Sequence, residues 1–159
     1  VGWGRGAGVM REIGAGIVGY LAGLPIFIAG TIVTLLIAMF SNLTPYHPGP
    51  FDMFEGGAWT AVSMVILACL WAPLLEELMF RGLLHSYLRH RFAAPYAGII
   101  GGLIFAAIHP QGWVSIPALA ALGFNFATIR EWRGSIIAPI TAHALHNGAV
   151  VGFVIVALM

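Results

Sequence analysis

Long apolar runs separated by short polar links dominate the pattern along this chain of 159 residues. A helix needs about 20 predominantly apolar residues to cross a bilayer. Residues 13–40 meet that length, and Pro25 within them predicts a kink. Three further apolar stretches follow later in the chain, at 94–109, 114–129 and 135–159.

One more segment precedes these three. Residues 58–71 are apolar, and after Pro73 the positions 74–91 keep helical periodicity but carry charges. A straight helix of that total length would measure about 50 Å, more than a bilayer core, so we expect Pro73 to break or tilt it. Proline and glycine cluster at 41–57, which predicts a loop there. The pattern predicts an all-α, polytopic transmembrane helix bundle with about five membrane segments.

Composition supports the membrane assignment. The chain is 60% hydrophobic and only 8% charged, whereas about a quarter of the residues of a soluble domain are charged. Its 7 basic residues are all arginine and nearly balance its 6 acidic ones, so no nucleic-acid partner is expected. The absence of lysine suggests a GC-rich, prokaryotic genome and therefore a prokaryotic plasma membrane. The lone Cys69 excludes an intrachain disulfide.

The arginines predict how the bundle is oriented. They precede the first segment, follow the second and follow the fourth, while the intervening loops at 41–57 and 110–113 contain none. Alternate ends are thus positive, and the positive-inside rule places the arginine-bearing ends in the cytoplasm.

No internal repeat or linker divides the chain, so residues 1–159 are interpreted as one domain. Because the sequence starts at valine, we expect that an N-terminal part is missing. Small residues such as Gly123 and Ala127, four apart, predict close helix packing.

Charges inside a membrane segment cost about 2.5–3.5 kcal/mol each, so the stretch "EELMFR" at 76–81 requires an explanation. Glu77 and Arg81 are four apart with the acid first, which favours a structural salt bridge. Glu76 lies about 100° away around the helix and has no partner in its own segment. Glu76 is therefore the candidate for chemistry.

Other polar residues interrupt the later apolar stretches. His109 ends one of them, and His143 and Asn147 share a helix face in another. His146 is better explained by packing or a hydrogen bond. His85 and His90, near a membrane edge, are explained by an interfacial position.

A depth estimate tests whether these groups can meet. At 1.5 Å per residue, Glu76 lies about 21 Å and His109 about 22 Å from the arginine-bearing ends of their segments. His143 and Asn147 lie about 13 and 19 Å from the corresponding end of theirs. Comparable depth on three segments predicts one polar site that is roughly mid-membrane and open to the cytoplasm.

These residues carry a family resemblance. "EELMFR" (76–81) resembles the EExxxR motif of the CPBP family of intramembrane proteases, which includes the CAAX prenyl endopeptidases and Abi-like proteins. "FAAIH" (105–109) resembles its FxxxH motif and "HALHN" (143–147) its HxxxN motif, in the family's order. The resemblance covers roughly residues 58–150. The chain departs from the pattern at Ala127, where a glycine is usual, and is shorter than most members.

The resemblance implies a set of roles. Glu76 and His109 would activate a water, His143 and Asn147 would steady the oxyanion of a tetrahedral intermediate, and Glu77 with Arg81 would brace the helix. A buried carboxylate can act as a general base, and His and Asn side chains can donate to an oxyanion. The implied activity is an intramembrane endopeptidase acting on peptides or lipidated proteins, including prenylated CAAX-type substrates.

Metal dependence stays open at this point. Glu76, His109 and His143 also form a plausible His₂Glu zinc set. Metal-free glutamate catalysis is favoured slightly, because Asn147 suits an oxyanion hole better than a zinc site.

Two other classes remain as alternatives to the protease. One is a non-catalytic bacteriocin-immunity or scaffold protein of the same fold, in which Glu76 would tolerate replacement by Gln. The other is a small proton-coupled carrier, in which Glu76 and the histidines would relay protons. Unprenylated peptides are an alternative to prenylated substrates.

Overall fold

The computed structural model describes residues 6–43 and 57–157. Four separate α-helices are α1 (Val9–Ser41), α6 (Ala94–Ala107), α7 (Ile116–Arg133) and α8 (Ile137–Ala157). A short 3₁₀ turn, η3 (Trp113–Ser115), precedes α7. Between α1 and α6 one helical run changes its winding along its length: α3 (Gly57–Ile66), η1 (Leu67–Trp71), α4 (Ala72–Glu77), η2 (Leu78–Leu84) and α5 (His85–Arg89). The loop predicted at 41–57 lies almost wholly outside the described residues.

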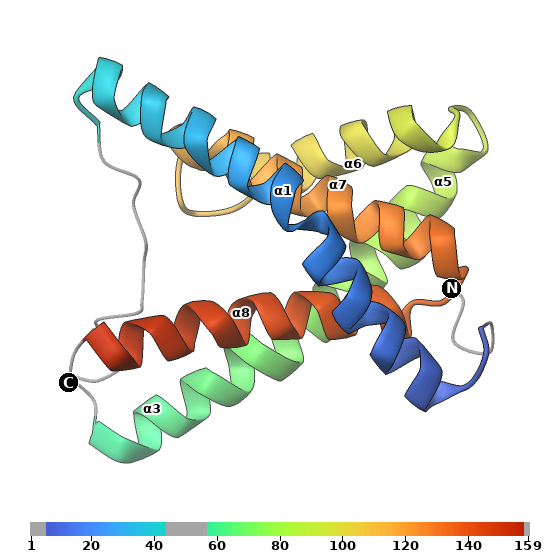
Figure 1. Cartoon of the computed structure of the whole chain (residues 1–159), viewed down its shortest axis with the longest axis horizontal. Helices are drawn as coiled ribbons and strands as arrows, with labels where there is room; N and C mark the ends of the chain where they lie inside the picture. The colour runs from blue at the N-terminus through green and yellow to red at the C-terminus, as the bar shows by residue number, and fades with distance from the viewer. Residues whose placement is uncertain (1–5, 44–56, 158–159) are drawn as a thin grey trace.

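The predicted all-α membrane bundle is confirmed. Within the described part of the chain three helical runs are long and apolar enough to cross a membrane: α1, the run Gly57–Arg89, and α8. The apolar α6 is shorter. The helix α7, predicted as a further segment, is not among these runs, and its 18 residues include Arg130, Glu131 and Arg133. It is the central helix and packs between α1 and α6 (Figure 1). Protein rather than lipid surrounds much of its surface, so α7 can carry polar residues.

The distribution of side chains suits a bilayer. Large apolar residues such as Phe40, Trp59 and Phe153 are exposed, whereas Glu77 and Arg81 are buried. In water this arrangement would be unfavourable, since exposed apolar surface is costly there. In lipid it is favourable, because charged groups face the bundle interior and pair with one another.

Neither proline predicted to disturb a helix ends one. The α1 helix continues through Pro25. The run Gly57–Arg89 continues through Pro73, so of the break or tilt predicted there, the break is not found. Instead, the turn that precedes Pro73 widens to a π-helix over η1. A π-turn is one of the few ways a helix accommodates a residue that lacks a backbone N–H.

Close packing at the small residues is confirmed. A Cβ placed on Gly102 would lie 2.7 Å from the carbonyl oxygen of Ala120, and one on Gly123 would lie 2.9 Å from the Cα of Gly102. The backbones of α6 and α7 therefore touch at a point where no larger residue fits. Ala127, one turn further along α7, is also buried.

Ion pairs tie the arginine-bearing ends together. Glu12, at the start of α1, is buried and accepts two hydrogen bonds from Arg133 at the end of α7, at 2.6 and 3.1 Å. Glu131 of α7 accepts hydrogen bonds from the Nε2 of His85 and the Nε of Arg89, both at 2.8 Å. The start of α1 and the ends of α5 and α7 thus lie at the same end of the bundle. His85, for which an interfacial position was predicted, lies at this end of the bundle with its side chain buried against α7.

Candidate active site

The two adjacent carboxylates lie in a short α-helical turn between two π-helical turns. Glu76 and Glu77 end α4, with η1 before them and η2, which contains Arg81, after them. Each π-turn inserts about one extra residue and so rotates the side chains that follow relative to an unbroken α-helix. Such turns are frequent at functional sites. Here they set the direction in which both glutamates point.

His143, on α8, lies between the two glutamates. Its Nδ1 is 2.9 Å from the Oε1 of Glu77, and its Nε2 is 3.7 Å from the Oε2 of Glu76. The side chains of His143 and Glu77 are almost completely buried. The imidazole also stacks on the ring of Phe126 at a centroid separation of 4.7 Å. Neighbouring carboxylates therefore face opposite nitrogens of one fixed ring.

His109 approaches the same carboxylate oxygen from a third element. It lies in the turn just after α6, and its Nδ1 is 2.6 Å from the carbonyl oxygen of Phe105. That bond caps one of the open carbonyls at the end of α6. The Nε2 of His109 is 3.7 Å from the Oε2 of Glu76, the same distance as the Nε2 of His143. The predicted meeting of these three groups is therefore observed.

The hydrogen bonds assign the protons on both rings. A carbonyl or carboxylate oxygen can only accept, so the Nδ1 of each histidine must be the donor. In the neutral ring the Nε2 is then an acceptor, and both face the Oε2 of Glu76. That oxygen is buried and receives no hydrogen bond from the described residues. With both rings neutral, three acceptors converge on one point, one more than the two protons of a water can satisfy. With His143 protonated, its Nε2 becomes a donor, and a water can then donate to Glu76 and to the Nε2 of His109.

The distances in this cluster differ from those of an ideal tetrahedral zinc site. The donor types are suitable, and both histidines have their Nδ1 held as metal-binding histidines do. Ligand atoms at 2.0–2.1 Å from a tetrahedral zinc lie about 3.4 Å apart, closer than the 3.7 Å found here between Glu76 and each histidine. Across residues 6–43 and 57–157, no group of three His, Cys, Asp or Glu side chains has the geometry of a metal site.

Arg81 stabilises the site through its bonds to Glu77 and to the backbone of α7. Its Nη1 donates to the Oε1 of Glu77 at 2.9 Å, which is the predicted salt bridge, and its Nη2 donates to the carbonyl oxygen of Gly123 at 2.7 Å. The guanidinium also lies over the rings of Phe105 and Phe126 at 4.9 and 5.2 Å. One buried cation thus joins η2 to α7 and fixes the carboxylate that holds His143.

Asn147 and His146 point to different neighbours. The Nδ2 of Asn147 donates to the carbonyl oxygen of Ala68 in η1, at 2.8 Å. His146 faces α1, where its Nδ1 is 3.3 Å from the Tyr20 hydroxyl and its ring contacts Phe27 edge-on at 4.9 Å. The packing role predicted for His146 agrees with these contacts.

Several contributors were given no role in the sequence interpretation. Phe105 supplies both the carbonyl that orients His109 and a ring beneath Arg81. Phe126 stacks on His143, and backbone carbonyls of Gly123 and Ala68 accept side-chain hydrogen bonds. Phe105 stands in "FAAIH" and could have been singled out there. The carbonyls could not, since nothing in a sequence marks an accepting backbone group.

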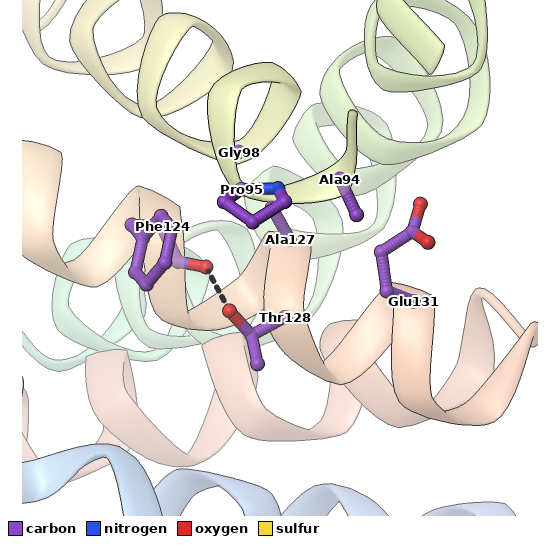
Figure 2. Close-up of a pocket in the computed structure, with 7 residues that line it drawn as sticks. All are labelled: Ala94, Pro95, Gly98, Phe124, Ala127, Thr128 and Glu131. Carbon is purple, nitrogen blue, oxygen red and sulfur yellow. Dashed lines mark hydrogen bonds between the residues drawn. The ribbon is translucent and has the colours of Figure 1, made fainter. Parts of the chain in front are cut away.

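A separate pocket lies between α6 and α7, away from this cluster (Figure 2). Its volume is about 190 Å³, and Glu131 lies at its edge. The Thr128 hydroxyl points back to the carbonyl of Phe124, its hydrogen-bond acceptor at 3.0 Å. The lining is mainly apolar and contains neither Glu76 nor a histidine.

Two curated proteins of Bacillus subtilis (strain 168) are similar to part of the chain. "Putative membrane peptidase YdiL" is 32% identical over 88 residues, which cover 55% of this chain and 36% of the relative. "Uncharacterized protein YpbD" is 29% identical over 86 residues, covering 52% and 41% respectively. The matches thus span well under half the length of each relative. No solved structure matches the chain.

The family comparison covers the residues that form the cluster. The family described as type II CAAX prenyl endopeptidase Rce1-like matches residues 58–149. That range contains both glutamates, Arg81, His109, His143 and Asn147. Because the match takes in more than half of the chain and all of this polar cluster, the chain belongs to the Rce1-like family of type II CAAX prenyl endopeptidases.

Proposed function

We propose that this protein is an intramembrane endopeptidase that hydrolyses peptide bonds with a water activated by Glu76 and His109. The observation that carries the proposal is the position of the Glu76 Oε2, which is 3.7 Å from the Nε2 of both His109 and His143. A water between these atoms donates one proton to Glu76 and is held by the Nε2 of His109. Glu76 is then placed as a general base.

The reaction needs two proton transfers. Glu76 removes a proton from the water as its oxygen attacks the peptide carbonyl carbon, and the carbonyl π electrons move onto the oxygen to give a tetrahedral oxyanion. The protonated Glu76 then gives this proton to the leaving amine as the C–N bond breaks. One water is consumed and two peptide ends are released, so Glu76 returns to its starting state.

His143 and Asn147 are the proposed oxyanion donors. Since the Nδ1 of His143 donates to Glu77, its Nε2 can donate to an oxyanion only when the ring is protonated. The carboxylate of Glu77 accepts the Nδ1 proton of that ring at 2.9 Å. Asn147 retains a second amide proton beyond the one donated to Ala68. Donors fixed in this way before the reaction lower its barrier most effectively.

The proposed substrates are membrane-associated peptides or lipidated proteins, including prenylated CAAX-type proteins. Two findings support this class: the family match, and the similarity of the chain to a relative named "Putative membrane peptidase YdiL". We place the arginine-bearing ends in the cytoplasm, with the active site reached from that side. We place the protein in a prokaryotic plasma membrane.

The test is cleavage by purified protein in detergent, with mass spectrometry of new termini in a peptide library that includes farnesylated CAAX peptides. Glu76→Gln keeps the shape of the side chain but removes the base, so we expect kcat to fall by about 10²–10⁴-fold. Glu131→Gln is the matched control, because it removes a carboxylate outside the cluster and should leave cleavage intact.

Each of three measurements can contradict the proposal. Cleavage that persists in Glu76→Gln would show that Glu76 is not the general base, and the proposed mechanism would then be wrong. Loss on chelation with recovery by zinc would replace the water mechanism with a metal one. Absence of cleavage, together with a cellular phenotype that persists in Glu76→Gln, would favour the scaffold or immunity class.

A further inference from the structure

The carbonyl of Ala68 lacks its ordinary helical partner. In an α-helix it would accept from the N–H of Ala72, but in the π-turn η1 that N–H donates to Leu67 instead. The next N–H along the chain, five residues after Ala68, would satisfy it in π geometry. That residue is Pro73, which has no N–H. The π-turn and the proline together leave this carbonyl open.

The side chain of Asn147 in α8 supplies the missing hydrogen-bond donor. Its Nδ2 donates to the Ala68 oxygen at 2.8 Å. The contact is partly buried, and a carbonyl shielded from water is stabilised by a donor, so the hydrogen bond is favourable as well as directional. It fixes the Asn147 amide plane relative to the helical run that carries Glu76, eight residues after Ala68.

We propose that Pro73 is a positioning residue that acts through the Ala68 carbonyl to hold Asn147 ready for the oxyanion. The inference rests on the proposed peptidase function. Asn147 has two amide protons, and donation of one to Ala68 leaves the second free for substrate. Pro73 is fully buried and lies three residues before Glu76, so one turn of helix sets both the base and an oxyanion donor.

Any other residue at position 73 would supply an N–H that competes with Asn147. This N–H can donate to Ala68 in π geometry, or the turn can revert to α-helix and pair Ala68 with Ala72. Either way the Ala68 carbonyl gains a backbone donor that competes with Asn147 and weakens its hydrogen bond. The replacement would otherwise be favourable, because alanine is a far better helix former than proline.

A first experiment reads the contact without relying on catalysis. The chain has three asparagines, Asn42, Asn125 and Asn147, so selective ¹⁵N-asparagine labelling gives three side-chain amide signals. The Asn147 signal is the one that disappears in Asn147→Ala. We expect Pro73→Ala to speed solvent exchange of its bonded proton by about tenfold or more. Pro139→Ala, which replaces another fully buried proline in the first turn of α8, should leave it unchanged.

A second experiment reads the role in catalysis. An oxyanion contact forms only in the transition state, so Pro73→Ala should lower kcat with KM unchanged. We expect a loss of about tenfold, against about 10²-fold for Asn147→Ala. The double variant should be no slower than Asn147→Ala alone, because Pro73 acts through Asn147. Pro73→Ser supplies the same N–H and should repeat these results if Pro73→Ala folds poorly.

The outcomes separate the two proposals. Unchanged exchange of the Asn147 amide in both Pro73 variants overturns the positioning role, as does a kcat loss that multiplies fully with that of Asn147→Ala. If the unmodified protein cleaves nothing, the peptidase proposal fails, while the exchange measurement still decides whether Pro73 keeps Ala68 open for Asn147.

Discussion

Glu77 serves two partners with one oxygen. Its Oε1 accepts from the Nη1 of Arg81 and from the Nδ1 of His143, each at 2.9 Å, and the side chain is fully buried. The carboxylate therefore neutralises a buried cation and also fixes the tautomer of a ring in the proposed oxyanion site. Its loss should affect both stability and activity, unlike the loss of Glu76.

Glu77→Gln removes the charge while keeping the shape. We expect it to lower the free energy of unfolding by about 3–5 kcal/mol, because Arg81 is left buried without a carboxylate. The double variant Glu77→Gln/Arg81→Met should recover part of that loss, since the unpaired cation is then gone as well. Denaturant titrations of the purified variants in detergent measure the difference. Equal stability of Glu77→Gln and the unsubstituted protein would contradict the argument.

Individual residues were predictable where the interaction stays within one helix. The Glu77–Arg81 pair follows from four-residue spacing, and the depth estimate correctly brought Glu76, His109 and His143 together. The same estimate placed Asn147 with them, and its amide donates to the Ala68 carbonyl instead. The contact between Glu77 and His143 was not predicted, since the two lie 66 residues apart and no periodicity connects them. For the same reason the burial of His85 against Glu131 was missed.

At the level of helices, two adjacent glycines of α6 have different surroundings. A Cβ on Gly102 would lie 2.7 Å from the Ala120 carbonyl oxygen and 3.0 Å from the Phe124 nitrogen, both backbone atoms of α7. A Cβ on Gly101 would meet only the Cδ1 of Leu88, at 3.9 Å. The two positions therefore form a matched pair for testing how closely α6 and α7 approach.

Gly102→Ala should force the helices apart. We expect it to lower the free energy of unfolding by about 1–3 kcal/mol, the usual cost of overpacking. Gly101→Ala should be neutral or stabilising by up to about 1 kcal/mol, because alanine is the better helix former and ordinary contact space is present. Denaturant titration of both variants side by side gives the comparison. A Gly102→Ala protein as stable as Gly101→Ala would show that the backbones are not in contact.

The positions of the helices were predicted from the sequence more accurately than their winding was. The stretches predicted at 94–109, 114–129 and 135–159 correspond to α6, α7 and α8. The two π-turns around α4 were not predicted, because π and α windings differ by one hydrogen-bond step and share the same residue preferences. Pro73 was the available signal, and it was interpreted as a break or tilt rather than as a local widening.

At the scale of the whole molecule, the ion pairs between residues that the structure describes gather in two places. One is the cluster around Glu76, and the other is the arginine-bearing end, where Glu12 pairs with Arg133 and Glu131 with Arg89. The second group joins the start of α1 and the ends of α5 and α7 at one end of the bundle. The alternation of arginines along the sequence thus corresponds to a real separation in space, which is what an orientation argument requires.

Orientation in the membrane is the last expectation to test. In a Cys69→Ala background, His90→Cys places a thiol at the arginine-bearing end, and Trp113→Cys places one in the exposed turn before α7. Positive charge favours the cytoplasmic side, so a membrane-impermeant maleimide on intact bacterial cells should label Trp113→Cys alone. His90→Cys should react only after permeabilisation. The reverse pattern would place the arginines outside, and the proposed access to Glu76 from the cytoplasm would then be wrong.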